Sequence, residues 1–170
     1  SRMLNLLVEA KAQKAKLVVF PELCLTTFFP RYYITDQAKL DEFYETEVPF
    51  SLMAEMFELI KEENIIISFG FAEKDNGTPF NTSVYVEPSK KIIGKYRKIH
   101  LPGHSEYEPQ RPFQHLEKRY FKKGNLGFPT FDTNLGKLGM CICNDRRWPE
   151  TYRVLALQGC EVVTLGYNTP

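Results

Sequence analysis

The chain has 170 residues, of which 43% are hydrophobic, so it is long enough to form one globular domain with a sizeable core. It carries 22 basic and 21 acidic residues and a formal net charge of +1, which argues against nucleic acid or an anionic membrane as a partner. Its apolar runs are far shorter than a membrane span and its N-terminus lacks a signal-peptide core, so we expect a soluble, cytoplasmic protein.

The cysteines and histidines predict neither a disulfide framework nor a metal site. The four cysteines are sparse and irregularly spaced, and no Cys-x-x-Cys pair occurs. His100 and His104 are four residues apart, but Pro102 and Gly103 between them predict a loop and not the helix on which zinc ligands have this spacing. We therefore expect reduced thiols and no bound metal.

The N-terminal segment predicts a helix followed by a short buried strand. Apolar residues from Met3 to Ala15 form one helical stripe, and Leu17 to Phe20 is a uniformly apolar run ended by Pro21. Glu22 comes directly after this strand, at the end where ligands gather in layered α/β folds. Glu22 also fits a solvated loop glutamate, and this segment alone does not separate the two interpretations.

Helices and strands then alternate through the middle of the chain. Residues 26–34 form a loop rich in aromatic side chains, helices are expected over 38–44 and 50–61, and strands over 65–71 and 81–86. Another strand is expected over 91–99, where Lys95 and Arg97 fit charges that protect a sheet edge. Lys98 differs because the strand ends there, so it could point into the same site as Glu22. Residues 104–119 show no clear periodicity.

A strand that runs into a polar cluster, from Leu138 to Glu150, is the most informative stretch. Met140 to Cys143 is apolar, the next residues are polar, and Pro149 begins a helix. A thiol at such a turn can lie near helix N-terminal amides, which lower its pKa and favour the thiolate. Cys143 also fits a buried structural cysteine, and Cys141 fits core packing. A strand over 128–133 precedes this stretch and one over 161–166 follows its helix, so the whole pattern predicts a layered α/β fold.

Three separated segments resemble motifs of the nitrilase superfamily of carbon-nitrogen hydrolases. They are residues 18–23 (VVFPEL), 94–103 (GKYRKIHLPG) and 143–150 (CNDRRWPE). Four further segments are similar to the N-carbamoyl-D-amino acid amidohydrolases, or D-carbamoylases, within this superfamily: residues 27–31, 111–121, 144–148 and 166–170. The resemblance implies a four-layer αββα sandwich.

The resemblance also implies roles for individual residues. Glu22, Lys98 and Cys143 would form the catalytic set, and Glu117 matches a second glutamate beside the lysine. Arg146 and Arg147 would hold the substrate carboxylate through paired guanidinium hydrogen bonds. The residues that would assist them are His100, His115, Asn144, Asn168 and Thr169.

The implied reaction hydrolyses N-carbamoyl-D-amino acids to D-amino acid, carbon dioxide and ammonia, without a metal or organic cofactor. Glu22 would take the thiol proton, Cys143 would attack the ureido carbonyl, and Lys98 would stabilise the oxyanion. Alternatives are a relative that acts on β-ureido acids or ω-amides, and a catalytically silent fragment or interaction module of the same fold.

The family domain is considerably longer than this chain. We expect residues 1–170 to form a single partial domain that lacks the first strand and the C-terminal part. The full-length form would be a homo-oligomer, a dimer or tetramer. An open sheet edge and an uncovered apolar face would favour self-association of the chain itself.

Overall fold

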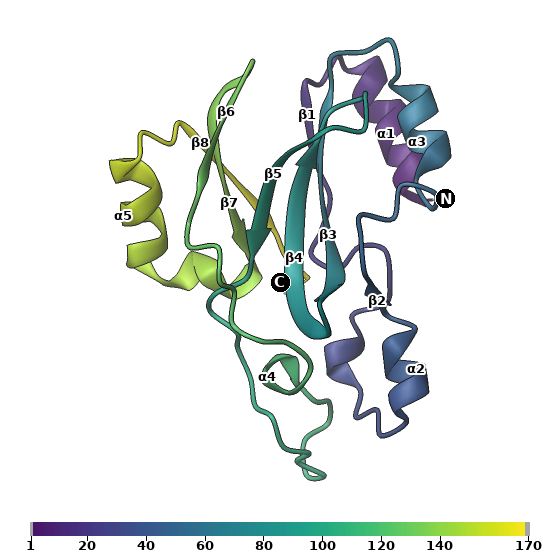
Figure 1. Cartoon of the computed structure of the whole chain (residues 1–170), viewed down its shortest axis with the longest axis vertical. Helices are drawn as coiled ribbons and strands as arrows, with labels where there is room; N and C mark the ends of the chain where they lie inside the picture. The colour runs from purple at the N-terminus through teal and green to yellow at the C-terminus, as the bar shows by residue number, and fades with distance from the viewer. Residues whose placement is uncertain (1, 169–170) are drawn as a thin grey trace.

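The computed structural model describes residues 2–168, which form two β-sheets packed face to face between helices (Figure 1). The first sheet has the order β1-β3-β4-β5, with β2 also paired to β3, and the second has the order β6-β7-β8. The strands of the first sheet are β1 (Leu17–Val19), β2 (Tyr44–Glu45), β3 (Ile66–Asp75), β4 (Thr78–Val86) and β5 (Ile92–Arg97). Those of the second are β6 (Thr130–Thr133), β7 (Gly136–Ile142) and β8 (Val162–Gly166).

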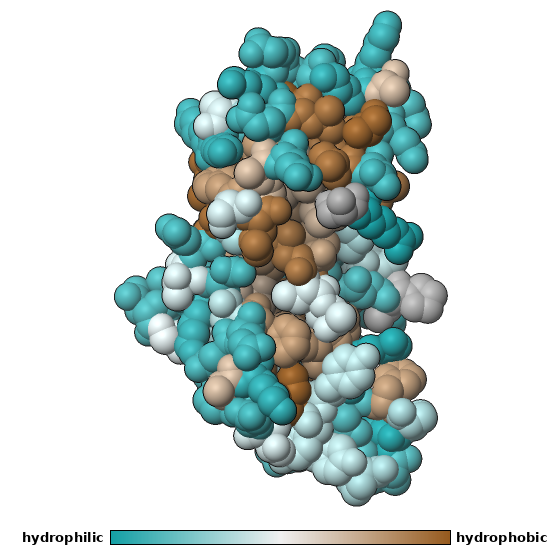
Figure 2. Space-filling view, turned by 90° about the vertical axis from the view of Figure 1, so that its right-hand side faces the viewer, coloured by the Kyte–Doolittle hydropathy of each residue, from teal (hydrophilic) through white to brown (hydrophobic). Residues whose placement is uncertain are grey.

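Helices cover the outer faces of both sheets. The α-helices are α1 (Arg2–Ala12), α2 (Gln37–Asp41), α3 (Ala54–Leu59), α4 (Glu117–Tyr120) and α5 (Pro149–Leu157). Two 3-10 turns, η1 (Phe29–Arg31) and η2 (Cys143–Arg147), complete the elements. α1 and α3 lie on the first sheet and α5 on the second, which gives the expected αββα order (Figure 1). Over α1 and α3 the surface is mostly hydrophilic, with hydrophobic side chains between the charged ones (Figure 2).

The core follows from the alternation of side chains along the strands. On β3 and β4, residues such as Ile67, Phe69 and Val84 pack outward against α1 and α3. Residues one position away face the other sheet, where Ile66, Tyr85 and Met140 belong to the cluster between the sheets. The face of the first sheet that packs against the second sheet is its inner face.

Strand directions bring two predicted site residues to the same end of the first sheet. β1 is parallel to β3, whereas β3–β4 and β4–β5 are both antiparallel, so β1 and β5 run the same way. The carboxyl ends of β1 and β5 therefore lie at the same end of the first sheet. Glu22 follows β1 and Lys98 follows β5 at that end.

Two predicted helices are shorter than the sequence pattern indicates. The helix expected over 38–44 ends at Asp41, and Tyr44 belongs to β2. The Tyr44 hydroxyl donates to Tyr120 O at 2.7 Å and its ring packs edge-on to Phe29, so tertiary contacts override the local pattern. The helix expected over 50–61 becomes helical only at Ala54. No helix within residues 2–168 combines the length and the apolar character needed to cross a membrane.

Candidate active site

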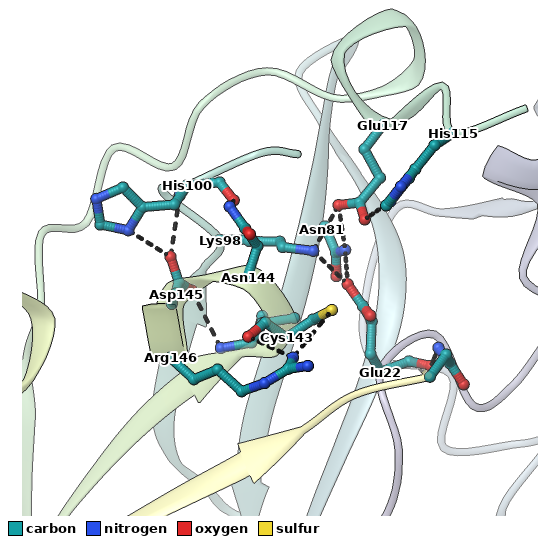
Figure 3. Close-up of polar contacts among 12 residues, drawn as sticks. Glu22, Asn81, Lys98, His100, His115, Glu117, Cys143, Asn144, Asp145 and Arg146 are labelled. Atoms are coloured by element: carbon teal, nitrogen blue, oxygen red, sulfur yellow. Dashed lines mark hydrogen bonds and ion pairs between the residues drawn. The ribbon is translucent and has the colours of Figure 1, made fainter. Parts of the chain in front are cut away.

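Three charged side chains form a buried cluster at the edge where β1 and β5 end (Figure 3). The Lys98 Nζ lies 2.6 Å from Glu22 Oε1 and 2.6 Å from Glu117 Oε2, and all three side chains are 0% exposed. Charges at this depth persist only when they are paired and hydrogen-bonded. One lysine between two glutamates leaves an excess negative charge, so the cluster is suited to holding a proton.

The turn that carries Glu22 is packed between the backbones of both sheets. A Cβ at Gly70 of β3 would lie 2.8 Å from Leu23 N and 3.1 Å from Glu22 Cα. A Cβ at Gly166 of β8 would lie 3.1 Å from Glu22 N. Leu23 has a φ of +48°, a left-handed conformation that non-glycine residues adopt rarely. The side chain of Asn168 donates to Glu22 O at 2.6 Å, which fixes the turn from a third direction.

Lys98 reaches the cluster because the β4–β5 pairing continues by one residue. Its backbone N–H donates to Asn81 O at 2.8 Å, and Gly124 N–H donates to Lys98 O at 2.8 Å. Lys98 therefore emerges on the inner face beside Asn81. Arg97, its neighbour on the extended chain, emerges on the opposite face.

Arg97 is not the edge-protecting charge that the sequence pattern predicts. Arg97 is only 4% exposed, and its guanidinium contacts Glu73 Oε2 at 2.8 Å and Asp75 Oδ2 at 2.7 Å. Lys95 also pairs with Glu73, but remains partly exposed. Burial raises the pKa of Glu73, but hydrogen bonds from Arg97 and Lys95 outweigh it and hold that pKa below its ordinary value. This network ties β5 to β3 directly behind Lys98.

Glu117 enters the cluster from α4, within the stretch that showed no periodicity. Its Oε1 lies 3.3 Å from His115 Nε2, and its Oε2 bonds Lys98. The ring of His115 packs edge-on to Phe28. His115 therefore supports Glu117 from the side away from Lys98.

Cys143 lies at the end of β7, where the strand turns sharply into η2. It is 4% exposed and has a φ of +46°, so the backbone at this residue is strained. Figure 3 shows its sulfur on the side of Glu22 and Lys98. Arg146 Nη1 donates to Cys143 O at 2.9 Å and lies 3.6 Å from Cys143 Sγ.

Cys141 has a different environment from Cys143. It is 2% exposed within β7, and burial, followed by the nearby Asp145 charge, raises its pKa to about 12. Its thiol is therefore protonated near neutral pH. This agrees with the prediction that Cys141 packs in the core.

The two glutamates have opposite pKa shifts despite sharing Lys98. Burial raises the pKa of Glu22, and the Glu117 charge raises it further, against the opposing effect of Lys98. Burial also raises the pKa of Glu117, but Lys98 and the His115 bond outweigh it, so the net shift is downward. Burial lowers the pKa of Lys98, but the charges of Glu22, Glu117 and Cys143 outweigh it and raise that pKa overall. Glu22 is thus the carboxylate of the pair that holds a proton more readily, and Glu117 is the anionic partner of the charged Lys98.

Asp145 connects the Cys143 turn to the end of β5. This fully buried carboxylate accepts hydrogen bonds from Tyr96 Oη at 2.8 Å and Ile142 N at 3.1 Å. It also accepts from His100 N at 2.9 Å, and its Oδ1 lies 2.8 Å from His100 Nδ1. Asp145 therefore links β7 and η2 to the segment two residues beyond Lys98.

The predicted carboxylate-binding residues do not all gather around the thiol. Arg146 lies beside Cys143, whereas Arg147 is exposed. The His100 ring is turned toward Asp145, away from the sulfur (Figure 3), and stacks on Trp148 at 4.9 Å. Asn144 Nδ2 donates to His100 O at 3.0 Å.

The remaining predicted residues lie around the glutamates. His115 contacts Glu117, and Asn168 contacts the backbone of Glu22. Thr169 lies outside the described residues. No group of three or more His, Cys, Asp or Glu side chains arranged to hold a metal occurs among residues 2–168.

Sequence reasoning missed Asn81. Asn81 is fully buried in β4, and its Nδ2 donates to Glu22 Oε1 at 2.7 Å. The available signal was a polar amide at the start of the strand expected over 81–86. That signal gives no partner, because the partners are 59 and 36 residues away in the chain.

Comparisons with known proteins identify the family of this chain. A family model described as "Carbon-nitrogen hydrolase" matches residues 1–169. An N-carbamoylputrescine amidase of Arabidopsis thaliana is 32% identical over 162 residues, covering 94% of this chain and 50% of that protein. A citrullinase of Francisella tularensis is 30% identical over 158 residues, covering 92% and 51%. The chain thus spans about half the length of these curated relatives.

A solved structure shares the fold. The carbon-nitrogen hydrolase from Helicobacter pylori G27 superposes with a TM-score of 0.79 at 31% identity. The match covers 98% of this chain and 53% of that one. The predicted α/β sandwich of this type is therefore confirmed.

Proposed function

Because this chain belongs to the carbon-nitrogen hydrolase family, whose members are cysteine-dependent hydrolases, we propose that it carries the catalytic residues for hydrolysis of a ureido C–N bond. The proposed nucleophile is Cys143, the base is Glu22, and Lys98 stabilises the oxyanion. Glu117 holds Lys98 in place and charged. We also propose that residues 1–170 are part of a single, longer domain that forms a homo-oligomer, with a cytoplasmic location that suits its four free cysteines.

One observation carries this proposal: a buried ammonium bridges two glutamates of opposite pKa shift, beside a strained cysteine. Buried polar atoms of a purely structural ion pair normally have hydrogen-bond partners. Glu22 Oε2 is buried and has no hydrogen-bond partner within the described part of the chain. An acceptor kept in this state is ready to take a proton.

The chemistry proceeds in two stages. Glu22 accepts the thiol proton, the thiolate attacks the ureido carbonyl, and Lys98 stabilises the negative oxygen. The protonated Glu22 returns the proton to the departing ammonia. Glu22 then activates a water that hydrolyses the thiocarbamate, and the resulting carbamic acid breaks down to carbon dioxide and the free amine.

For the substrate we propose an N-carbamoyl amino acid, with the D-carbamoyl form as the specific case. The two relatives above are named for ureido compounds, which supports the reacting group. The guanidinium of Arg146, which lies 3.6 Å from Cys143 Sγ, supports a carboxylate at the other end of the substrate, because a guanidinium can bind a carboxylate through paired hydrogen bonds. A β-ureido acid or an ω-amide would use the same catalytic residues.

The test compares turnover of N-carbamoyl-D-phenylalanine, its L form, N-carbamoylputrescine and an ω-amide. Cys143→Ala should abolish ammonia release, because it removes the nucleophile. Cys141→Ala is the matched control two residues away and should retain most activity. Full activity in Cys143→Ala, or loss only in Cys141→Ala, would overturn the assignment. A wild-type protein that is folded but silent on all four compounds would favour an interaction module instead.

A further inference from the structure

Asn81 contacts both glutamates of the site, although the reaction described above does not use it. Its Nδ2 lies 2.7 Å from Glu22 Oε1 and 3.4 Å from Glu117 Oε2. These are the two oxygens that Lys98 also contacts. Asn81 and Lys98 therefore bind the same side of the carboxylate pair.

The orientation of the Asn81 amide follows from its surroundings. The reverse orientation would place the amide oxygen against two carboxylate oxygens, which repel it. The position of the side chain is fixed by the sheet, since Asn81 pairs with Ala72 of β3 and its carbonyl accepts the Lys98 N–H. Asn81 thus presents a donor to Glu22 from a rigid strand.

As a consequence, the two oxygens of Glu22 differ. Oε1 accepts from Lys98 Nζ at 2.6 Å and from Asn81 Nδ2 at 2.7 Å. Oε2 is equally buried, and within residues 2–168 it has no hydrogen-bond partner. An oxygen that already accepts two strong hydrogen bonds is less basic than one that accepts none.

We propose that Asn81 is a positioning residue that holds Glu22 Oε1 with Lys98 and so makes Oε2 the oxygen that accepts the thiol proton. This inference rests on the proposed role of Glu22 as the base. Asn81 acts through Glu22 and needs no contact with the substrate.

The charged groups around Glu22 determine how a substitution of Asn81 affects the ionisation of Glu22. Lys98 faces Glu22 from the end of β5, and Cys143 faces it from η2. Glu117 faces it from α4 and is itself paired with His115, which precedes that helix. Asn81 is a neutral donor among them. Its removal therefore weakens the stabilisation of ionised Glu22 without altering any charge.

The experiment measures the rate of iodoacetamide alkylation of Cys143 as a function of pH, with the modified peptide identified by mass spectrometry. Asn81→Ala should move the midpoint of the profile upward by about half a pH unit or more, because Glu22 then holds its proton more tightly. Asn81→Asp keeps the shape of the side chain but adds a negative charge beside Glu22, so it should move the midpoint of the alkylation profile further upward. Ser83→Ala is the control, since Ser83 lies two residues along the same face of β4 and its hydroxyl donates to Phe69 O at 3.4 Å.

Turnover gives an independent readout where a substrate is found. Asn81→Ala should lower kcat by about tenfold or more and change KM little, because the base is misplaced while the binding residues remain. Superimposable alkylation profiles for the wild type and both Asn81 variants would overturn the inference, as would a lower melting temperature with an unmoved midpoint. A shifted midpoint in a protein that hydrolyses no ureido compound or amide would uphold it and overturn the proposed function.

Discussion

At the scale of single residues, the site divides two identical functional groups into two roles. Glu22 and Glu117 share Lys98, but Glu117 has the additional His115 contact, whereas one oxygen of Glu22 has no hydrogen-bond partner among residues 2–168. Environment, and not residue type, therefore decides which carboxylate accepts a proton. The two neighbouring thiols also differ by environment: Cys141 lies within β7, whereas Cys143 lies at the turn that ends this strand.

The raised pKa of Glu22 predicts the acid side of the pH profile. The proposed base, Glu22, must be deprotonated to act, so kcat/KM should fall as pH decreases through a pKa above the ordinary glutamate value of 4.5. Glu117→Gln removes a charge that raises this pKa, and should move the acid limb to lower pH while reducing the maximal rate. Measuring kcat/KM against pH tests both statements. Glu108→Gln, at a partly exposed carboxylate paired with Arg111, is the control and should leave the acid limb in place. An acid limb that moves to higher pH in Glu117→Gln would contradict this account.

At the scale of elements, the geometry of the site depends on turns held at the ends of strands. The turn after β1 fits between Gly70 and Gly166, and the turn after β7 is held by Asp145. Neither turn can shift without moving a reacting group.

Gly70→Ala should therefore impair activity more than stability. The new Cβ would lie 2.8 Å from Leu23 N and push the Glu22 turn away from Lys98. We expect a fall in kcat of about 10²-fold, since small displacements of positioned groups have effects of this order. Measurements of kcat and melting temperature check this prediction.

The control is Gly94→Ala, on β5. Its Cβ would meet the rings of Phe131 and Tyr85 at 2.9 Å, away from the charged cluster. This variant should lose stability but retain most of its kcat when folded. Equal losses of kcat in the two variants would show that the Gly70 contact has no special role.

At the scale of the whole molecule, the chain exposes apolar side chains on its second sheet and the helix that covers it. Leu157 is 76% exposed and Val154 38%, and their spacing of three places them on one face of α5. β8 is an edge strand in the described chain, and its Val162 is 45% exposed. Exposed apolar side chains beside an open edge favour association between molecules.

We therefore expect this chain to self-associate in a concentration-dependent manner. Leu157→Lys should reduce the association, because it places a charge in the apolar face of α5. Leu126→Lys, in the turn before β6 and also exposed, should have little effect. Size-exclusion chromatography with light scattering at several concentrations measures the change. A monomeric wild-type chain at every concentration would contradict the prediction.

The sequence by itself determined most of the elements and the three strand ends at which Glu22, Lys98 and Cys143 lie. Strand ends are visible in a local pattern of apolar and polar residues. The layered α/β class followed from the same pattern, because strand and helix periodicities differ. These conclusions needed only neighbours in the chain, whereas the roles proposed for the three residues came from the family resemblance.

Only the tertiary structure decided which side chains meet. Asn81 lies 59 residues from Glu22 in the chain, and the burial of Arg97 depends on Glu73, its ion-pair partner on β3. The side-chain direction of Tyr44 and the turned ring of His100 likewise follow from contacts with Tyr120 and Asp145. The physical reason is that burial and hydrogen-bond partners are properties of strand register and sheet packing, which local periodicity does not encode.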